Sequence, residues 1–251
     1  MNKDVGAGKR ICDRSQMRVT GVDACKRGWV AVTLQAPGPV LAAVRMHASL
    51  AGVLDEGPGS ADPARIVGID MPLGLVEAGW RDADRLARGL LGPRRSSIFA
   101  IPPRPVWAQA TYQAANQRCR ELTGQGFRIQ AWGLRPKLLE ANEYVRSCGH
   151  PMYEVHPELA FGAIAGAPLP HSKHTAPGRD LRRDLLANVG IILPAVASRT
   201  GTSSAPKLPV TDTLDAAAVA WSAWRIAAGT AVVLPDQPQL DRHGREITIR
   251  Y

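Results

Sequence analysis

Two segments of the sequence each end an apolar run on an aspartate. MRVTGVDACKRGWVAVTL, residues 17–34, reads as two short strands, and Asp23 stands where the first strand ends. ARIVGIDMPLGL, residues 64–75, repeats the pattern with Asp70, followed by a proline and a glycine. Aspartate is common at such positions as a turn former or helix cap. The alternative is a pair of carboxylates gathered at one sheet edge to hold a metal ion.

Further acidic residues occur on another predicted strand and at a helix start. Glu154 lies on a short strand in YEVHPE, and Asp212 and Asp215 begin the last long helix, three residues apart and therefore on one face. Carboxylates converging from several segments suit two-metal phosphoryl hydrolysis, because hard Mg²⁺ or Mn²⁺ ions take oxygen ligands. Each residue also has a structural interpretation: Asp212 as an N-cap, Asp215 as a charge favoured by the helix dipole, and Glu154 as a surface strand residue.

Basic residues supply candidate phosphate contacts. Arg94, Arg95 and Arg104 stand in GPRRSSIFAIPPRPVW, a segment with four prolines. The prolines and apolar residues predict a rigid, packed loop that presents its arginines, and arginine suits bidentate phosphate contact. Lys137 and Lys173 are further candidates, with a solvated surface position as the alternative for both.

The overall charge agrees with a polyanionic partner without requiring one. The 251 residues carry a formal net charge of +9, from 31 Lys and Arg against 22 Asp and Glu. Such a balance favours nucleic acid through counterion release. Many arginine-rich proteins are basic for no specific reason, so charge alone leaves this partner open.

Composition points to a cytoplasmic protein. Apolar residues make up 45% of the chain, and no apolar run reaches the roughly 18 residues of a membrane span. Residues 1–18 are polar, lack the apolar stretch of a signal peptide, and read as a disordered leader or an expression remnant. The four cysteines are far apart, without zinc spacing, and are expected to be reduced packing residues.

The elements that must position the acidic residues begin with three strands, at 17–24, 28–34 and 39–46. Short turn-rich links predict an antiparallel meander. A helix at 49–56 leads to a fourth, wholly apolar strand at 64–70, buried on both faces as parallel strands are. A right-handed crossover through that helix lays strand four parallel to strand one. Asp23 and Asp70 then become neighbours at the edge where open α/β sheets bind ligands.

The rest of the chain reads as mainly helical. PMYEVHPELAFGAIAG, residues 151–166, predicts a fifth strand that runs into a helix with Pro157 at its first position. RTGTSSAPKLPV, residues 199–210, predicts a flexible loop, and the tail ends in a strand. HSKHTAPGRDLRRDLLANVG, residues 171–190, predicts a polar loop and then an amphipathic helix. Other helices are predicted at 79–91, 107–122, 130–148 and 211–229.

Seven segments, in this order, resemble the domain-of-unknown-function family 429: GVDACKRGWVAV, VGIDMPLGL, RDADRLARGLLGPRRSSIFAIPPRPV, QAWGLRPKLLE, YEVHPELAF, HSKHTAPGR and DTLDAAAVAWSAWRI. That family is described as predicted nucleases of the RNase H-like fold. The resemblance covers about Val19 to Tyr251. It implies one α/β domain over 19–251 with a mixed sheet of strand order 3-2-1-4-5, flanking helices and a helical insertion at about 93–149.

The segment DTLDAAAVAW is also similar to the C-terminal acidic helix of Holliday-junction resolvases, where D-x-x-D-A closes the metal site. On that analogy Asp23, Asp70 and Asp215 are the core ligands of Mg²⁺ or Mn²⁺, and Asp212 and Glu154 are auxiliaries. The resemblance thus implies that the three core aspartates are catalytic.

These features favour a metal-dependent nuclease, in which an activated water attacks a DNA or RNA phosphodiester in line. Three alternatives stay open: an actin-like phosphotransferase, for which the chain is short; a non-catalytic nucleic-acid or protein interaction module; and a hydrolase of a small phosphate ester, if the insertion covers the site. Converging carboxylates reached by an open basic groove would favour the nuclease. The sequence leaves the form of the nucleic acid and the oligomeric state open, a dimer included.

Overall fold

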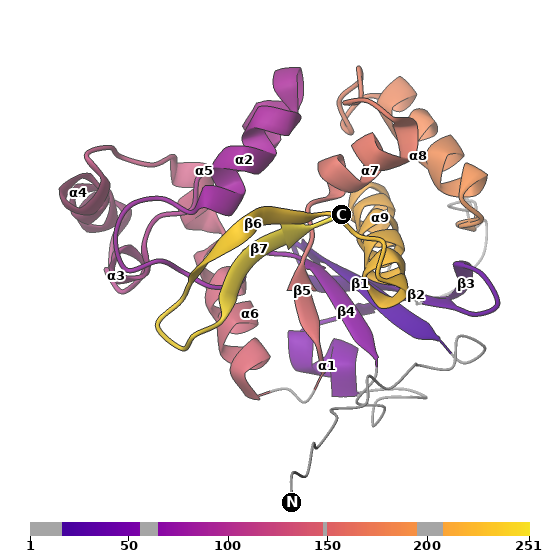
Figure 1. Cartoon of the computed structure of the whole chain (residues 1–251), viewed down its shortest axis with the longest axis horizontal. Helices are drawn as coiled ribbons and strands as arrows, with labels where there is room; N and C mark the ends of the chain where they lie inside the picture. Colours follow the sequence, from indigo (N-terminus) through magenta and orange to yellow (C-terminus); the bar gives the residue numbers. More distant parts are fainter. Residues whose placement is uncertain (1–16, 56–64, 148–149, 195–207) are drawn as a thin grey trace, which may run out of the picture.

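The computed structural model describes residues 17–55, 65–147, 150–194 and 208–251 (Figure 1). Residues 1–16 of the predicted leader and most of the predicted loop at 199–210 lie outside these ranges, as do Cys12 and Cys148. The last two residues of the predicted leader belong to the fold instead, because Met17 is buried and the first strand begins at Arg18.

A mixed sheet of five strands forms the centre of the fold, in the order β3-β2-β1-β4-β5. β2 is antiparallel to both β1 and β3, whereas β4 runs parallel to β1 and β5 runs parallel to β4. This arrangement confirms the predicted fold class, an RNase H-like mixed sheet. The strands are β1 (Arg18–Cys25), β2 (Gly28–Gln35), β3 (Val40–His47), β4 (Ile66–Asp70) and β5 (Met152–Glu154).

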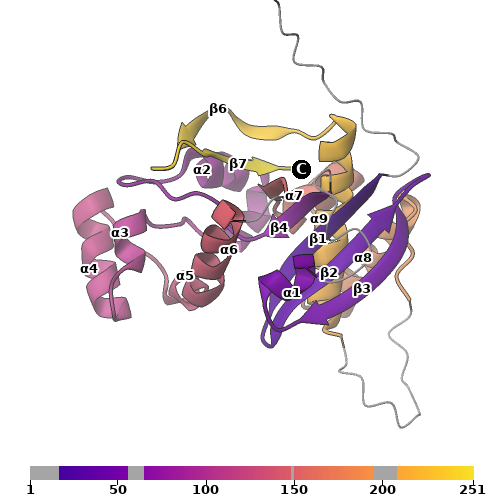
Figure 2. The same ribbon diagram turned by 90° about the horizontal axis from the view of Figure 1, so that it is seen from below.

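Helices cover both faces of the sheet. Helices α3, α4 and α5 of the predicted insertion lie apart from β1–β3, beyond α6, as Figures 1 and 2 both show. A 3-10 helix at Gly92–Ser97 occupies the start of the predicted arginine loop. The α-helices are α1 (Leu50–Asp55), α2 (Asp82–Leu90), α3 (Arg104–Trp107), α4 (Tyr112–Thr123), α5 (Ile129–Gly133), α6 (Arg135–Ser147), α7 (Pro157–Ala165), α8 (Ala176–Asn188) and α9 (Val210–Ala228).

The nearly continuous apolar sequence of the central strands follows from burial on both faces. In β2, Trp29 and Ala31 belong to a core that includes residues of α1 and α6. Val30 and Val32 of the same strand belong to a second core, which includes residues of α7, α8 and α9. None of the helices in the described ranges has the length and apolar character that crossing a bilayer requires.

Two of the predicted helices are each divided in two. The helix expected at 107–122 is α3 followed by α4, because Thr111 caps α4 by accepting a hydrogen bond from a backbone N–H of its first turn. The helix expected at 130–148 divides at Leu134 into α5 and α6. Pro136 lies just after the division, and it has no N–H with which to continue the helical hydrogen bonds.

The C-terminal tail forms a hairpin that packs against α2 and lies next to β5 (Figure 1). Its strands are β6 (Val233–Leu240) and β7 (Glu246–Arg250), paired antiparallel. The sequence predicts β7 but not β6. Pro235 and Pro238 lie within β6, and proline cannot donate to a strand ladder, so the pattern of β6 is not typical of a strand.

Candidate active site

Asp23 and Asp70 lie side by side at the carboxyl ends of β1 and β4. The two residues are register partners of this parallel pair, and neighbouring strands run about 4.8 Å apart. Both residues line the same cavity, and Asp23 is only 6% exposed. The crossover predicted from the sequence therefore brings these two carboxylates to one place.

Helix α9 brings Asp215 to this cavity because the helix packs closely against both strands. Gly21 of β1 leaves room for it: a Cβ there would lie 2.1 Å from the backbone nitrogen of Ala220. At Gly68 of β4, a Cβ would lie 2.9 Å from a methyl carbon of Val219. Asp215 is about one turn before Val219, lines the cavity and is only 1% exposed. The two glycines thus set the distance between α9 and the aspartates of the sheet.

Asp212 lies one turn earlier on α9 and is half-buried. Pro209 is the N-cap residue of the helix, so Asp212 lies inside the first turn and is not the cap. The hydroxyl of Thr211 lies 3.2 Å from Asp212 Oδ1 and donates to it. Asp212 contributes to the raised pKa of Asp23, which places its charge near the site, although it is not part of the cavity wall.

Glu154 of β5 is buried and held by groups within the protein. Its Oε2 accepts hydrogen bonds from the backbone N–H of Leu73, at 2.8 Å, and from the buried guanidinium of Arg81. Arg81 also lies 3.5 Å from a carboxylate oxygen of Asp84. Burial raises the pKa of Glu154 to about 7, although Arg81 lowers it. Glu154 is therefore a paired residue of the cavity wall, and its surface-strand interpretation does not apply.

Glu158, in the first turn of α7, is a wall residue that sequence reasoning missed. It is 7% exposed and pairs with the fully buried guanidinium of Arg182, 2.5 Å away. Its other carboxylate oxygen is buried without a hydrogen-bond partner among the described residues. The only signal in the sequence is its position after Pro157, where an acidic residue is also favoured by the helix dipole.

Lys173 places an ammonium among these carboxylates. Its Nζ lies 2.5 Å from Asp215 Oδ2, and its side chain is 34% exposed. The charges of Asp215, Asp70 and Asp23 all raise the pKa of Lys173 and outweigh the lowering by burial. Lys173 was predicted to contact phosphate; in this structure it is the counter-ion of Asp215.

The cavity holds more negative charge than Lys173 neutralises. Burial raises the pKa of Asp23 well above its ordinary value, and the charges of Asp70 and Asp215 raise it further. Burial also raises the pKa of Asp70 to about 8; Lys173 opposes this, and Asp215 adds to it. Carboxylates in such surroundings are stabilised by taking up protons or by binding a cation.

The chemistry of these donors fits a hard divalent cation, because carboxylate oxygens from β1, β4 and α9 share one buried site. The side chains are not yet arranged as a coordination shell: within the described ranges, no group of three His, Cys, Asp or Glu residues stands close enough to hold a metal ion. The ammonium of Lys173 supplies positive charge to these carboxylates, through its contact with Asp215. Lys173 occupies Oδ2 of Asp215, so a metal ion that binds this oxygen must displace the ammonium.

The cavity measures about 550 Å³, and two histidines line it, His156 just after β5 and His174 next to Lys173. His156 Nε2 lies 3.4 Å from the carbonyl oxygen of Ser97. Burial lowers the pKa of His156 to about 4. At neutral pH this imidazole is therefore uncharged, and it does not offset the negative charge of the aspartates.

Only two of the five predicted phosphate-binding residues, Arg94 and Lys173, line the acidic cavity. Arg94 donates to the carbonyl oxygens of Leu169 and Pro170, so it fastens the 3-10 helix to the loop that carries Lys173. Arg95, on the same 3-10 helix, is exposed and does not line the cavity.

The other two predicted residues lie elsewhere and pair with nearby acids. Arg104 makes two hydrogen bonds of 2.6 Å to the carboxylate of Glu77. Lys137 lies over the ring of Trp29 and 3.3 Å from a carboxylate oxygen of Glu140. The pair of Lys137 and Glu140 is local, three residues apart on α6, and could be read from the sequence. The pair of Arg104 and Glu77, 27 residues apart, is made only by the fold.

A second cavity, of about 430 Å³, adjoins the acidic one. The two cavities share a wall that consists of Asp84, Ser96, Ile98 and Phe99. Beyond this wall the character of the surface changes from acidic to basic and aromatic. The residues that give it this character are Arg85, Arg88, Arg128, Trp80 and Phe127.

Comparison with known proteins gives one match. A family profile described as "Protein of unknown function (DUF429)" matches residues 21–240. Searches of curated proteins and of solved structures return no match to the chain. The matched range contains every acidic residue of the site.

Proposed function

The chain belongs to the DUF429 family, and we propose from its site that it hydrolyses phosphodiester bonds of nucleic acid with the help of divalent metal ions. The observation that carries this is the convergence of Asp23, Asp70 and Asp215 from three elements in one cavity. We also propose, from the composition, that the protein acts in the cytoplasm.

Asp23, Asp70 and Asp215 would hold the metal ions, with Asp212 and Glu154 close enough in the fold to assist. When bound, Mg²⁺ or Mn²⁺ would activate a water molecule and stabilise the leaving oxygen. The excess of buried negative charge supports this assignment, since the same carboxylates make the metal-free site costly to keep ionised.

Lys173 and Arg94 supply the positive charge of the cavity. Once Lys173 leaves Asp215, its ammonium can donate to a phosphate oxygen, and its partial exposure allows this movement. Arg94 is held by the carbonyl groups of Leu169 and Pro170, so it stays at the wall and offers a fixed charge to the substrate. Both residues would orient the phosphate and not break the bond.

The neighbouring cavity supports nucleic acid as the substrate. Arg85, Arg88 and Arg128 are able to contact phosphates, and Trp80 and Phe99 are half-buried aromatics on which bases can stack. Because this surface shares a wall with the acidic cavity, a strand held there would lie next to that cavity. The net charge of +9 favours the same partner.

A small phosphate ester is the second candidate, and burial of the acids favours it. Asp23 is 6% and Asp215 is 1% exposed, so the reacting phosphate must enter the cavity. The phosphate of a small ester can enter the cavity alone, whereas the phosphate of a nucleic acid must bring part of its strand with it. Cleavage of a model diester without cleavage of nucleic acid would select this candidate.

The test is a calorimetric titration with Mn²⁺ and a cleavage assay on the wild type, Asp70→Asn and Asp236→Asn. The substrates are linear, hairpin and four-way DNA, single-stranded RNA and the small diester bis(p-nitrophenyl) phosphate. We expect the wild type to bind Mn²⁺ and cleave, and Asp70→Asn to lose both properties. Asp236 is exposed on β6, so its variant should behave as the wild type. Absence of Mn²⁺ binding by the wild type would overturn the proposal.

A further inference from the structure

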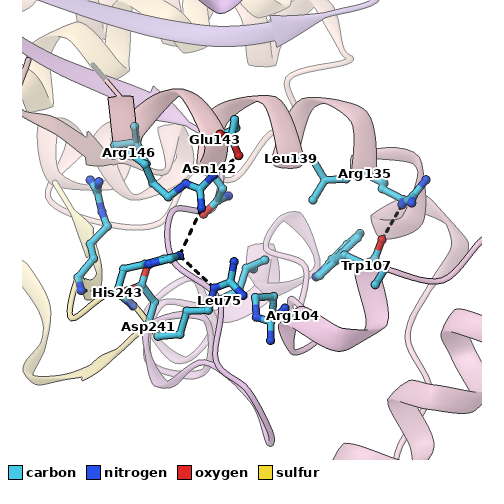
Figure 3. Close-up of a pocket in the computed structure, with 14 residues that line it drawn as sticks. Leu75, Arg104, Trp107, Arg135, Leu139, Asn142, Glu143, Arg146, Asp241 and His243 are labelled. Atoms are coloured by element: carbon cyan, nitrogen blue, oxygen red, sulfur yellow. Dashed lines mark hydrogen bonds and ion pairs between the residues drawn. The ribbon is translucent and has the colours of Figure 1, made fainter. Parts of the chain in front are cut away.

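A third cavity, of about 650 Å³, lies between helix α6, helix α3 and the turn that joins β6 to β7 (Figure 3). It shares no wall residue with the acidic cavity. Nothing in the function proposed above uses it. Its wall is rich in arginine where the active-site cavity is rich in aspartate and glutamate, so the two cavities suit ligands of opposite charge.

Five guanidinium groups line this cavity: Arg104, Arg135, Arg146, Arg242 and Arg245. The carboxylates that face them are Glu143 and Asp241 in the wall and Glu77 beside Arg104. Among these eight named side chains, the positive charges outnumber the negative charges by two. Asp241 is also engaged in the β6–β7 turn, where its Oδ1 accepts the backbone N–H groups of His243 and Arg245.

Two of the guanidinium groups meet at a single neutral acceptor. Arg242 Nε lies 3.0 Å and Arg146 Nη1 lies 3.4 Å from Nε2 of His243. A guanidinium can only donate, so Nε2 accepts from both, and the imidazole proton must sit on Nδ1. One lone pair cannot serve two donors well. In the described ranges no carboxylate lies within ion-pair distance of Arg242. Arg146 is already paired with the carboxylate of Glu143, so an anion at this point would pair with Arg242 and add a second acceptor for Arg146.

The opposite end of the cavity combines an apolar side chain, Leu139, with a fixed guanidinium, that of Arg135. Figure 3 shows Arg146 and His243 at one end, and Leu139, Trp107 and Arg135 at the other. Leu139 is 39% exposed and offers an apolar surface to the cavity. Arg135 is fixed there by a 2.8 Å hydrogen bond from Nε to the Trp107 carbonyl oxygen and by its position over Trp132.

We infer that this cavity binds an organic phosphate monoester, with its phosphate at Arg146 and Arg242 and its apolar or planar body against Leu139. A phosphate monoester carries nearly two negative charges at neutral pH, which matches the excess of two positive charges. Guanidinium groups suit its oxygens, and the volume suits a molecule of nucleotide size. The monoester can belong to a free nucleotide or to the 5′ end of a nucleic-acid strand.

The test measures binding by calorimetry in EDTA, so that it does not depend on metal or on catalysis. The probes are AMP, adenosine, and a short oligonucleotide with either a 5′-phosphate or a 5′-hydroxyl. We expect phosphate-bearing probes to bind the wild type, and Arg242→Gln and Arg146→Gln to weaken that binding about tenfold or more. Adenosine, which has no phosphate, should bind the wild type no more tightly than these variants bind AMP.

Two controls separate this site from the active site and from general charge. Arg118→Gln removes an exposed arginine of α4 that pairs with Glu121 and should leave AMP binding unchanged. Asp70→Asn should also leave it unchanged, even if it abolishes Mn²⁺ binding. A 5′-phosphorylated strand that binds more tightly than AMP would identify strand ends as the source, and the reverse order would identify free nucleotides. No binding of any phosphate-bearing probe, or equal binding by Arg242→Gln, would overturn the inference.

Discussion

Asp23 and Asp70 are register partners on adjacent parallel strands, so two buried carboxylates meet at the edge of the sheet. The strands cannot move them apart, because both residues belong to the hydrogen-bonded ladder. Burial raises the pKa of each carboxyl group. The fold thus keeps a costly arrangement of like charges, which is a property of binding sites more than of structural turns.

The cost of this arrangement predicts a specific dependence of stability on pH. The pKa of Asp70 is about 8 in the folded protein, raised from an ordinary value of 3.8, so the folded state holds this proton more tightly. The free energy of unfolding should therefore fall as pH rises from about 4 to about 8, and then level off. Asp70→Asn has no carboxyl group at this position, so it lacks this part of the decrease in the free energy of unfolding with pH. We expect it to be more stable than the wild type by roughly 2–5 kcal/mol at pH 8 and above.

Urea unfolding in EDTA between pH 4 and pH 9 measures this difference. Asp236→Asn, at an exposed position of β6, should follow the wild-type curve. If Asp70→Asn were no more stable than the wild type at pH 8, the ionised form of Asp70 would not be under strain in the folded protein.

The meeting of the two strand-end aspartates could be predicted because it depends on patterns that are local in the sequence. Apolar runs define the strands, short turns fix the antiparallel meander, and the handedness of the crossover fixes the direction of β4. The placement of Asp215 against them depends on Gly21 and Gly68, which allow α9 to approach. Their role is visible only when the helix is in place.

The partners of the buried charges could not be predicted. Glu154 and Arg81 are 73 residues apart in the chain, and neither residue has a local pattern that points to the other. Glu158 and Arg182 are likewise a pair made by the packing of α7 against α8. For the same reason Arg104 could be recognised as basic but not as the partner of Glu77. These three ion pairs are made by the tertiary structure, while strands and helices follow local sequence.

The close contact between β1 and α9 predicts that Gly21→Ala is strongly destabilising. The added Cβ would lie 2.1 Å from the backbone nitrogen of Ala220 and 2.3 Å from the backbone oxygen of Ala216. Backbone atoms cannot rotate away, so the helix must shift. We expect a loss of about 3 kcal/mol or more in the free energy of unfolding, and weaker Mn²⁺ binding in the fraction that folds.

Gly89→Ala is the matched control for this variant. Gly89 is exposed near the end of α2, and a Cβ there would have no neighbour within 4 Å. Alanine is a better helix former, so this variant should be more stable by about 0.5–1 kcal/mol. Thermal unfolding of the two variants gives both results. Equal stability of Gly21→Ala and the wild type would contradict the close approach of α9.

The buried pair of Arg81 and Glu154 predicts a large loss of stability on removal of one partner. Arg81→Met leaves Glu154, and also Asp84, without the guanidinium that faces them. Removing one member of a buried ion pair typically costs about 3–5 kcal/mol. Arg104→Met breaks an ion pair whose side chains are 37% and 48% exposed, and such pairs contribute about 0–1 kcal/mol. Similar losses in the two variants would show that Glu154 does not depend on Arg81.

The contact between Lys173 and Asp215 predicts competition between the ammonium and a metal ion. Asp215 is 1% exposed, and Lys173 Nζ lies 2.5 Å from its Oδ2. Lys173→Met should therefore lower the stability of the metal-free protein, by about 2 kcal/mol given the partial exposure of the lysine. It should also enlarge the rise in Tm that Mn²⁺ causes, because the ion no longer has to displace the ammonium. Lys137→Met, whose lysine pairs with Glu140 away from the site, should leave that rise at its wild-type size. A rise that is equal in all three proteins would mean that Lys173 and the metal ion do not share Asp215.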